Sequence, residues 1–289
     1  MKKIGLTFLM VLAICAICFG QVVKSKVVDN GGSGPYKSIV TVEETLPDFA
    51  IYRPENMKAA VQEEGKLPIL AFANGGCSNT SITHEKVLSE IASQGYIVIA
   101  IGAMQMTFDD RPHGKAEAEM LIEAIDWIEK QSKNSGSEFN NMADMSKVAI
   151  GGQSCGGAQV AFVAKDPRIS TYIMFNTGMG TMEMAGASPE SLNNFHGPVV
   201  YIIGGEPDVA YANAIVDFEN IKHVPVAFAN LVEGGHMGTF AEEYGGSFAD
   251  MATDWLDWQL KGENENAKVF TESDLSSYSG WSMDAKNFK

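Results

Sequence analysis

The chain is poor in basic residues and in long apolar runs, and each shortage excludes a class of partner. Among 289 residues, 21 are Lys or Arg and 36 are Asp or Glu, which gives a net charge of −15. A surface this acidic repels nucleic acids and anionic membranes, so we expect neither as a partner. One apolar run is long, Ile4 to Phe19. Its length of ~16 residues falls short of the ~20 that a membrane-spanning helix needs.

This apolar run lies near the N-terminus, where Lys2 and Lys3 precede it. With the small residue Gly20 before a cleavage point, the pattern predicts a signal peptide at residues 1–20. A membrane anchor is the alternative, which the short run disfavours. We therefore expect a secreted or periplasmic protein without a membrane span in the mature chain. Residues 21–289, with 19 basic and 36 acidic residues and a net charge of −17, suit one catalytic domain.

Short apolar runs alternate with helical patterns along the rest of the chain. Near-continuous apolar runs indicate strands that are buried on both faces, as in a parallel sheet. The alternation predicts a doubly wound α/β fold, with a mostly parallel sheet flanked by helices. Residues 29–36 are expected to be a flexible lead-in and residues 58–66 a polar connector. The predicted strands are 38–45, 49–52, 67–73, 96–101, 148–150, 169–175, 199–203 and 226–231, and the predicted helices are 83–93, 115–131, 156–164, 210–221 and 248–260.

A candidate nucleophile follows the predicted strand at 148–150. The motif G-x-S-x-G occurs at Gly152, Ser154 and Gly156, between that strand and a predicted helix. This context predicts a sharp turn that exposes the hydroxyl of Ser154 at the edge of the sheet, while the glycines let neighbouring backbone pass close by. The motif alone also occurs by chance, so its position between strand and helix is what supports Ser154.

A serine nucleophile needs a base, and the base needs an acid to orient it. His236 is the candidate base because it lies between glycines just after the last predicted strand. The candidate acid is Asp208, shortly after the strand at 199–203, although it could simply cap the next helix. Glu206 is the close alternative and Asp217 the more distant one. The other histidines fit less well, because two precede the serine, one follows only a loop and one ends a helix (His84, His113, His196 and His223).

Acyl transfer develops negative charge on a carbonyl oxygen, which two backbone N–H groups usually stabilise. One donor is expected from Cys155, the residue after the nucleophile. The other is expected from the loop after the strand at 67–73, where Gly76 is the candidate. A plain glycine turn is the alternative for Gly76.

Taken together, these motifs resemble those of the α/β-hydrolase superfamily. More narrowly, they resemble its branch of secreted esterases that are similar to dienelactone hydrolases and to cutinases (polyester hydrolase-like). The likeness extends from about residue 39 to residue 261. It is carried by NGGCSN at 74–79, EIASQGYIVIAIG at 90–102, GGQSCGGAQ at 151–159 with DPRI at 166–169, GGEPDVAYANA at 204–214 and GGHMGTF at 234–240.

The resemblance implies an α/β-hydrolase fold and hydrolysis of carboxylic esters without a metal or organic cofactor. Ser154, Asp208 and His236 match the family triad. The chain departs from cutinase-like enzymes in two places, with Cys155 where they carry Met and Gly76 where they carry an aromatic residue. The C-terminal cysteine pair of the polyester-degrading group is also missing. A small-molecule or carbohydrate-linked ester, such as an acetyl or feruloyl ester, therefore fits at least as well as a polyester.

Only two cysteines, Cys77 and Cys155, lie beyond the predicted signal peptide. Both flank the oxyanion donors, whose loops must meet at one carbonyl oxygen. In an oxidising compartment we therefore predict a disulfide between them, which would fix the two donors relative to each other. The chain-entropy model gives such a long loop roughly 4–5 kcal/mol of stabilisation. The alternative is a pair of buried thiols that only pack together.

The sequence leaves two questions open, the role of a methionine-rich segment and the class of reaction. The segment 176–198 carries Met179, Met182 and Met184, which either cap the substrate pocket or pack onto the core. An esterase is the leading hypothesis because the triad is complete. The alternatives are a peptidase or acyltransferase on the same fold, or a non-catalytic binding protein.

Overall fold

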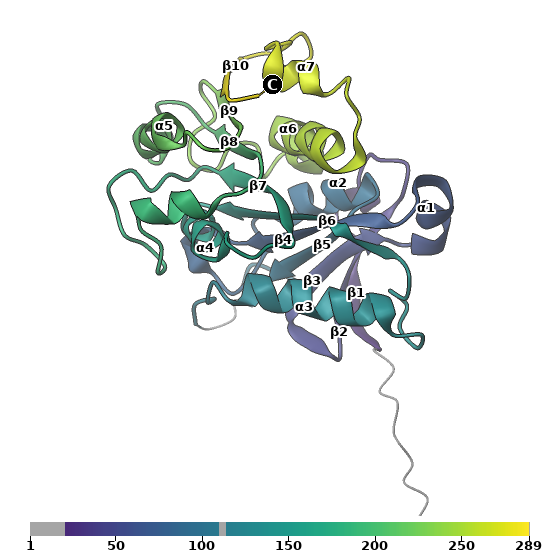
Figure 1. The fold of residues 1–289 in the computed structure, drawn as a ribbon. Helices are drawn as coiled ribbons and strands as arrows, with labels where there is room; N and C mark the ends of the chain where they lie inside the picture. Colours follow the sequence, from purple (N-terminus) through teal and green to yellow (C-terminus); the bar gives the residue numbers. More distant parts are fainter. Residues whose placement is uncertain (1–20, 110–113, 289) are drawn as a thin grey trace, which may run out of the picture.

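Ten strands of the described residues form one mixed sheet (Figure 1). A computed structural model describes residues 21–109 and 114–288, so the predicted signal peptide and His113 lie outside the described residues. The spatial order is β1-β2-β3-β5-β4-β6-β7-β8-β9-β10. The strands are β1 (Val22–Lys26), β2 (Ser38–Glu43), β3 (Leu46–Pro54), β4 (Leu67–Ala73), β5 (Ile97–Ile101), β6 (Ala143–Gln153), β7 (Ile169–Phe175), β8 (Val199–Ile203), β9 (Val226–Leu231) and β10 (Trp281–Lys286).

The strands from β5 to β9 in this order are parallel, and they form the centre of the sheet. The antiparallel strands β1, β2 and β3 extend one side of the sheet, and β10 pairs antiparallel with β9 at the other edge. The carboxyl ends of the parallel strands therefore meet at one edge, where ligand sites of such sheets lie. This arrangement confirms the predicted α/β class and is consistent with an α/β-hydrolase fold.

Helices cover both faces of the sheet because its strands are apolar on both sides. In β4, Ile69 and Ala71 pack into one core cluster, whereas Leu70 and Phe72 pack into the other. The first core includes residues of α1 (Met57–Glu64), α3 (Met120–Lys133), α4 (Cys155–Val163) and α5 (Tyr211–Asn220). The second includes residues of α2 (Glu85–Ser93), α6 (Gly246–Leu256) and α7 (Ala267–Thr271).

The structure corrects the predicted connector at residues 58–66, which is mostly helical. The helix α1 begins after Asn56, whose side chain accepts a hydrogen bond from the Ala59 N–H at 3.1 Å. This cap satisfies one of the free N–H groups at the start of a helix. Met57 and Ala60 are buried, while the charged side chains face outward. Two turns with so few apolar residues carry too little periodicity to stand out in the sequence.

The predicted lead-in at residues 29–36 is packed against α2 rather than free. The Ser33 backbone N–H and hydroxyl both donate to the Glu90 carboxylate at 2.7 Å. Gly34 N–H donates to the Ser93 hydroxyl at 3.0 Å. Among the described residues, no helix has the length and apolar character to cross a membrane.

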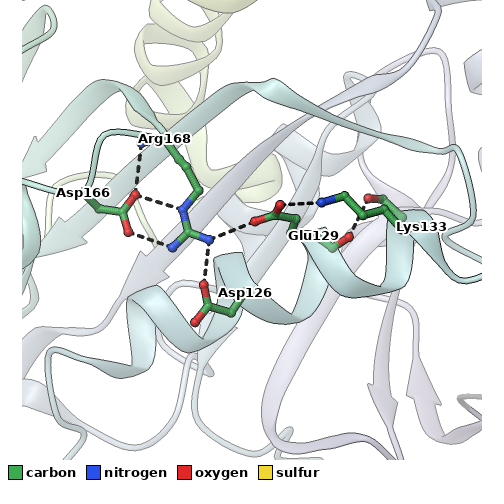
Figure 2. A network of polar contacts seen from close by, with 6 residues as sticks. Asp126, Glu129, Lys133, Asp166 and Arg168 are labelled. Carbon is green, nitrogen blue, oxygen red and sulfur yellow. Dashed lines mark hydrogen bonds and ion pairs between the residues drawn. The ribbon is translucent and has the colours of Figure 1, made fainter.

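A charged cluster fastens the start of β7 to α3 (Figure 2). The Arg168 guanidinium contacts Asp166 at 2.7 and 2.9 Å, Asp126 at 2.6 Å and Glu129 at 3.1 Å. Glu129 also pairs with Lys133 at 2.6 Å, one turn further along the helix. The cluster thus connects the α4–β7 turn with α3, at the opposite end of β7 from its carboxyl end.

Candidate functional site

Ser154 lies at a sharp turn between β6 and α4, as its motif predicts. Its backbone adopts φ 54° and ψ −118°, outside the regions that non-glycine residues favour. An added Cβ at Gly152 would lie 2.4 Å from the Gly156 backbone, and one at Gly156 would lie 2.3 Å from the Ala73 carbonyl oxygen. Only glycine therefore allows the turn to pack this closely against the helix and against the end of β4.

The structure brings the three predicted triad residues together at the carboxyl edge of the sheet. His236 Nε2 lies 3.0 Å from Ser154 Oγ, and His236 Nδ1 lies 2.7 Å from Asp208 Oδ1. The imidazole is half-buried, whereas the Asp208 carboxylate is fully buried. With Nδ1–H donating to the carboxylate, Nε2 is left free to accept the serine proton. This arrangement can remove a proton from the Ser154 hydroxyl.

Four donors surround the Asp208 carboxylate. Besides His236, it accepts hydrogen bonds from Asn176 Nδ2 at 2.7 Å, the Ala210 N–H at 2.9 Å and the Gly204 N–H at 3.2 Å. Burial raises the pKa of Asp208, but these hydrogen bonds outweigh burial and hold the pKa below its usual range. The carboxylate is therefore charged at neutral pH and can stabilise an imidazolium.

Two residues after β7 belong to the site but were not predicted from the sequence. Asn176 Nδ2 donates both to Asp208 and to the Gly235 carbonyl oxygen, at 2.7 and 3.1 Å. The Thr177 hydroxyl donates to the Ser154 carbonyl oxygen at 2.8 Å. Both follow the carboxyl end of a parallel strand directly, and this position is the signal that would have pointed to them.

The candidate oxyanion turn, Gly75–Cys77, lies beside the start of α4. A disulfide joins Cys77 to Cys155, whose Cα atoms are 5.1 Å apart. The turn is held further by Asn74 Nδ2, which donates to the Ser78 and Ile101 carbonyl oxygens at 3.1 and 2.6 Å. Gly76 has φ 64° within this turn. The covalent link thus connects the two segments that carry the predicted oxyanion donors, Gly76 and Cys155.

The alternative acids and bases lie elsewhere. Glu206 is exposed, and Asp217 is buried, where it accepts hydrogen bonds from the Met179 and Gly180 N–H groups at 2.6 and 2.8 Å. Burial raises the pKa of Asp217 to about 6, although these hydrogen bonds oppose the shift. The other described histidines are held by the Phe72 and Phe240 rings, by the Tyr172 hydroxyl and by the Phe195 carbonyl oxygen (His84, His196 and His223).

A recess of about 310 Å³ lies beside the loop of His236. Its lining is mostly apolar and includes Ile82, Phe108, Met237 and Phe240. Phe108 is 55% exposed and Met237 is 50% exposed. The recess can accommodate an apolar group beside Met237 and Gly238, the two residues that follow His236.

The methionine-rich segment shows one of the two expected roles, packing onto the core, for two of its three methionines. Met179 is buried in the core and Met184 packs against it, whereas Met182 is exposed at 46%. None of the three lines the recess beside His236. Across residues 21–109 and 114–288, no group of three or more His, Cys, Asp or Glu side chains is arranged to hold a metal ion.

Comparison with known protein families gives a match over more than half of the chain. Residues 28–196 match the Chlorophyllase family, which consists of serine esterases of the α/β-hydrolase superfamily. The match confirms the predicted superfamily and includes Ser154 but ends before Asp208 and His236. No curated protein gives a significant match to the chain.

Proposed function

The chain belongs to the chlorophyllase family of α/β-hydrolase esterases, and from this premise we propose that it hydrolyses carboxylic esters through an acyl-enzyme on Ser154. The observation that carries the proposal is the continuous hydrogen-bonded chain from Ser154 Oγ through His236 to Asp208, at 3.0 and 2.7 Å. Distances of this size permit proton transfer from the hydroxyl to the imidazole.

The reaction follows from these positions. Ser154 Oγ attacks the ester carbonyl carbon while His236 Nε2 takes the hydroxyl proton, and Asp208 stabilises the imidazolium that forms. When the tetrahedral intermediate collapses, the alcohol leaves with the proton from His236, and the acyl group stays on Ser154. A water molecule then gives a proton to His236 and attacks the acyl carbon, which releases the acid and restores the serine hydroxyl.

The charge on the tetrahedral oxygen needs its own donors. We assign them to the backbone N–H groups of Gly76 and Cys155, from the oxyanion turn and the first residue of α4. The N-terminus of α4 adds a partial positive charge at the same place. Donors held in advance stabilise the transition state more than water does, because no reorganisation is needed.

The substrate proposed is a small-molecule or carbohydrate-linked ester, with no metal or organic cofactor in the reaction. The recess beside the loop of His236 is mostly apolar and about 310 Å³ in volume, which suits a small aliphatic or aromatic group better than a polymer chain. An ester panel that varies the acyl group from acetyl through butyryl and feruloyl to long-chain would define the preference.

The nucleophile is tested by labelling with a serine-directed phosphonate. Wild type should form one adduct, located by mass spectrometry on the peptide that contains Ser154. Ser154→Ala should lose both the adduct and ester hydrolysis, whereas Ser277→Ala, at an exposed serine, should keep both. Equal labelling of Ser154→Ala would end the esterase mechanism. Activity only on amides, or only with an acceptor alcohol, would instead favour a peptidase or an acyltransferase.

A further inference from the structure

The side chain of Gln153 lies between the backbone of His236 and the oxyanion turn, Gly75–Cys77. Gln153 is the last residue of β6 and directly precedes Ser154, yet its side chain is buried, with 2% of the residue exposed. Its Nε2 donates a hydrogen bond to the His236 backbone carbonyl oxygen at 3.1 Å. The amide thus holds the main chain of the residue whose imidazole faces Ser154.

The other end of the same amide faces the oxyanion turn. A Cβ added at Gly75, the first residue of that turn, would lie 1.8 Å from Gln153 Oε1. The turn and the Gln153 amide are therefore packed too closely for any side chain at position 75. A shift of the amide away from Gly75 would also move it relative to the His236 carbonyl oxygen.

The imidazole of His84 contacts the side chain of Gln153. His84 is fully buried and packs against the Phe72 and Phe240 rings, with ring centroids 5.2 and 5.0 Å apart. Burial lowers the pKa of His84 to about 4, and its contact with Gln153 offsets only part of that shift. His84 is thus neutral at physiological pH, and Phe240 belongs to the loop that follows His236.

From these contacts we propose that Gln153 is a positioning residue that couples the oxyanion turn to the loop of His236. This inference rests on the proposed serine mechanism. The imidazole must stay within hydrogen-bond reach of Ser154 Oγ while the substrate oxygen occupies the oxyanion turn. One amide in contact with both segments fixes the position of the proton acceptor relative to the oxyanion donors, and it does so without touching the substrate.

The direct test compares Gln153→Ala with wild type and with Gln131→Ala, a matched change at a buried glutamine on α3 (4% exposed). A change in the position of the imidazole relative to the oxyanion turn affects the transition state more than substrate binding, because both proton transfers pass through His236. We expect kcat of Gln153→Ala to fall by about 10- to 100-fold, the size of effect that a misplacement near 1 Å produces. KM should change by no more than about threefold, and Gln131→Ala should keep the wild-type kcat.

A double-mutant cycle separates coupling from general damage. Gly75→Ala pushes the Gln153 amide aside, so it should lower kcat as Gln153→Ala does. If one amide mediates both effects, Gly75→Ala/Gln153→Ala should be no slower than Gly75→Ala alone, because the added methyl then has room. If the two losses multiply, the residues act independently and the proposal fails.

Other outcomes are equally informative. Gln153→Ala with unchanged kcat, or with raised KM and unchanged kcat, would overturn the positioning role. If Gln153→Ala does not fold, as judged by its thermal transition, Gln153→Met keeps the side-chain length without the donor and gives the same kcat test. Ester hydrolysis retained by Ser154→Ala would remove the proposed function itself. An inactive Ser154→Ala beside a fully active Gln153→Ala would overturn only the present inference.

Discussion

Two aspartates of this chain, Asp208 and Asp166, make hydrogen bonds of similar length in very different surroundings. Asp208 is buried at the carboxyl edge of the sheet and accepts from His236 and from neutral amides at 2.7 to 3.2 Å. Asp166 is partly exposed and accepts from the Arg168 side chain and backbone at 2.7 to 3.0 Å (Figure 2). Both carboxyls have a lowered pKa.

The causes of the two pKa shifts differ, and this difference predicts how each site responds to change. For Asp166 the largest influence is the hydrogen bonds from the Arg168 guanidinium, which lower its pKa. For Asp208 the largest influence is burial, which raises the pKa and must be outweighed by several donors together. A surface ion pair can be replaced by water at little cost, whereas a buried charge that loses a partner is left uncompensated.

The largest effect is expected from Asp208→Asn. The neutral amide carries no charge to stabilise the imidazolium, and an Nδ2 that faces His236 Nδ1 would place the imidazole proton on Nε2, so the proton acceptor for Ser154 is lost. We expect kcat to fall on the order of 10³- to 10⁴-fold, measured with a soluble ester under saturation. Glu206→Gln, two residues away and exposed, is the matched control and should change kcat by less than about twofold. If Asp208→Asn keeps near wild-type activity, another acid orients the imidazole.

The next effect should come from the covalent link at the same buried edge. Removing the disulfide in Cys77→Ala/Cys155→Ala frees a loop of 78 residues in the unfolded chain. The chain-entropy model gives roughly 4–5 kcal/mol for a loop of this size, or a fall of about 10 °C in Tm. Calorimetry of wild type with a reductant should reproduce the fall, and the double variant should not respond to the reductant. An unchanged Tm would mean that noncovalent contacts alone hold the oxyanion turn.

A third carboxyl, Asp217, sharpens the comparison because burial outweighs hydrogen bonding in its effect on the pKa, the reverse of Asp208. Burial outweighs its hydrogen bonds and raises its pKa from 3.8 to about 6. The folded protein therefore binds this proton more tightly than the unfolded chain. The resulting stability is present below about pH 4 and is lost as the pH rises through about 6.

This balance is tested with Asp217→Asn, which removes the titration. Between about pH 4 and pH 7, the free energy of unfolding of wild type should decline relative to the variant by roughly 1–3 kcal/mol. Urea denaturation across this range measures the difference. Because Asn cannot accept both amide N–H groups in the same way, the variant is less stable overall, and only the change with pH is diagnostic. Parallel curves for the two proteins would contradict the raised pKa.

The smallest effect is expected at the surface cluster. Arg168→Ala should lower the free energy of unfolding by at most about 1 kcal/mol, and the loss should shrink in high salt. Activity should stay at the wild-type level, because the cluster lies at the opposite end of β7 from the site. A loss of several kcal/mol, or of activity, would show that the surface pair matters as much as the buried one.

The sequence predicted the central strands and the spatial neighbours at their carboxyl ends because both follow from strong patterns. Four of the predicted strands match the observed bounds, among them β4 and β7. Glycine-flanked Ser154 and His236 stand out because their chemistry requires particular residue types. Asn176 and Gln153 do not stand out, because an amide that only holds other residues has no sequence motif of its own.

The elements missed at the two edges of the sheet had weak signals for a physical reason. Residues of β1 are mostly exposed and include three polar side chains, Lys24, Ser25 and Lys26. In β10 only Trp281 is buried, where its ring packs against Phe248 at a centroid distance of 5.4 Å. An edge strand needs apolar residues on fewer sides than a central one, so its apolar pattern is shorter and less regular.

The Cys77–Cys155 bond also has a practical consequence for producing the protein. The bond joins the two segments proposed to carry the oxyanion donors, so the thiol state during expression determines which form of the protein is purified. A host that keeps its cytosol reducing would yield the dithiol form, whereas export to an oxidising space would yield the bonded form. Preparations from the two hosts should therefore differ in heat tolerance even though their polypeptides are identical, and counting free thiols before each assay would reveal which form is present.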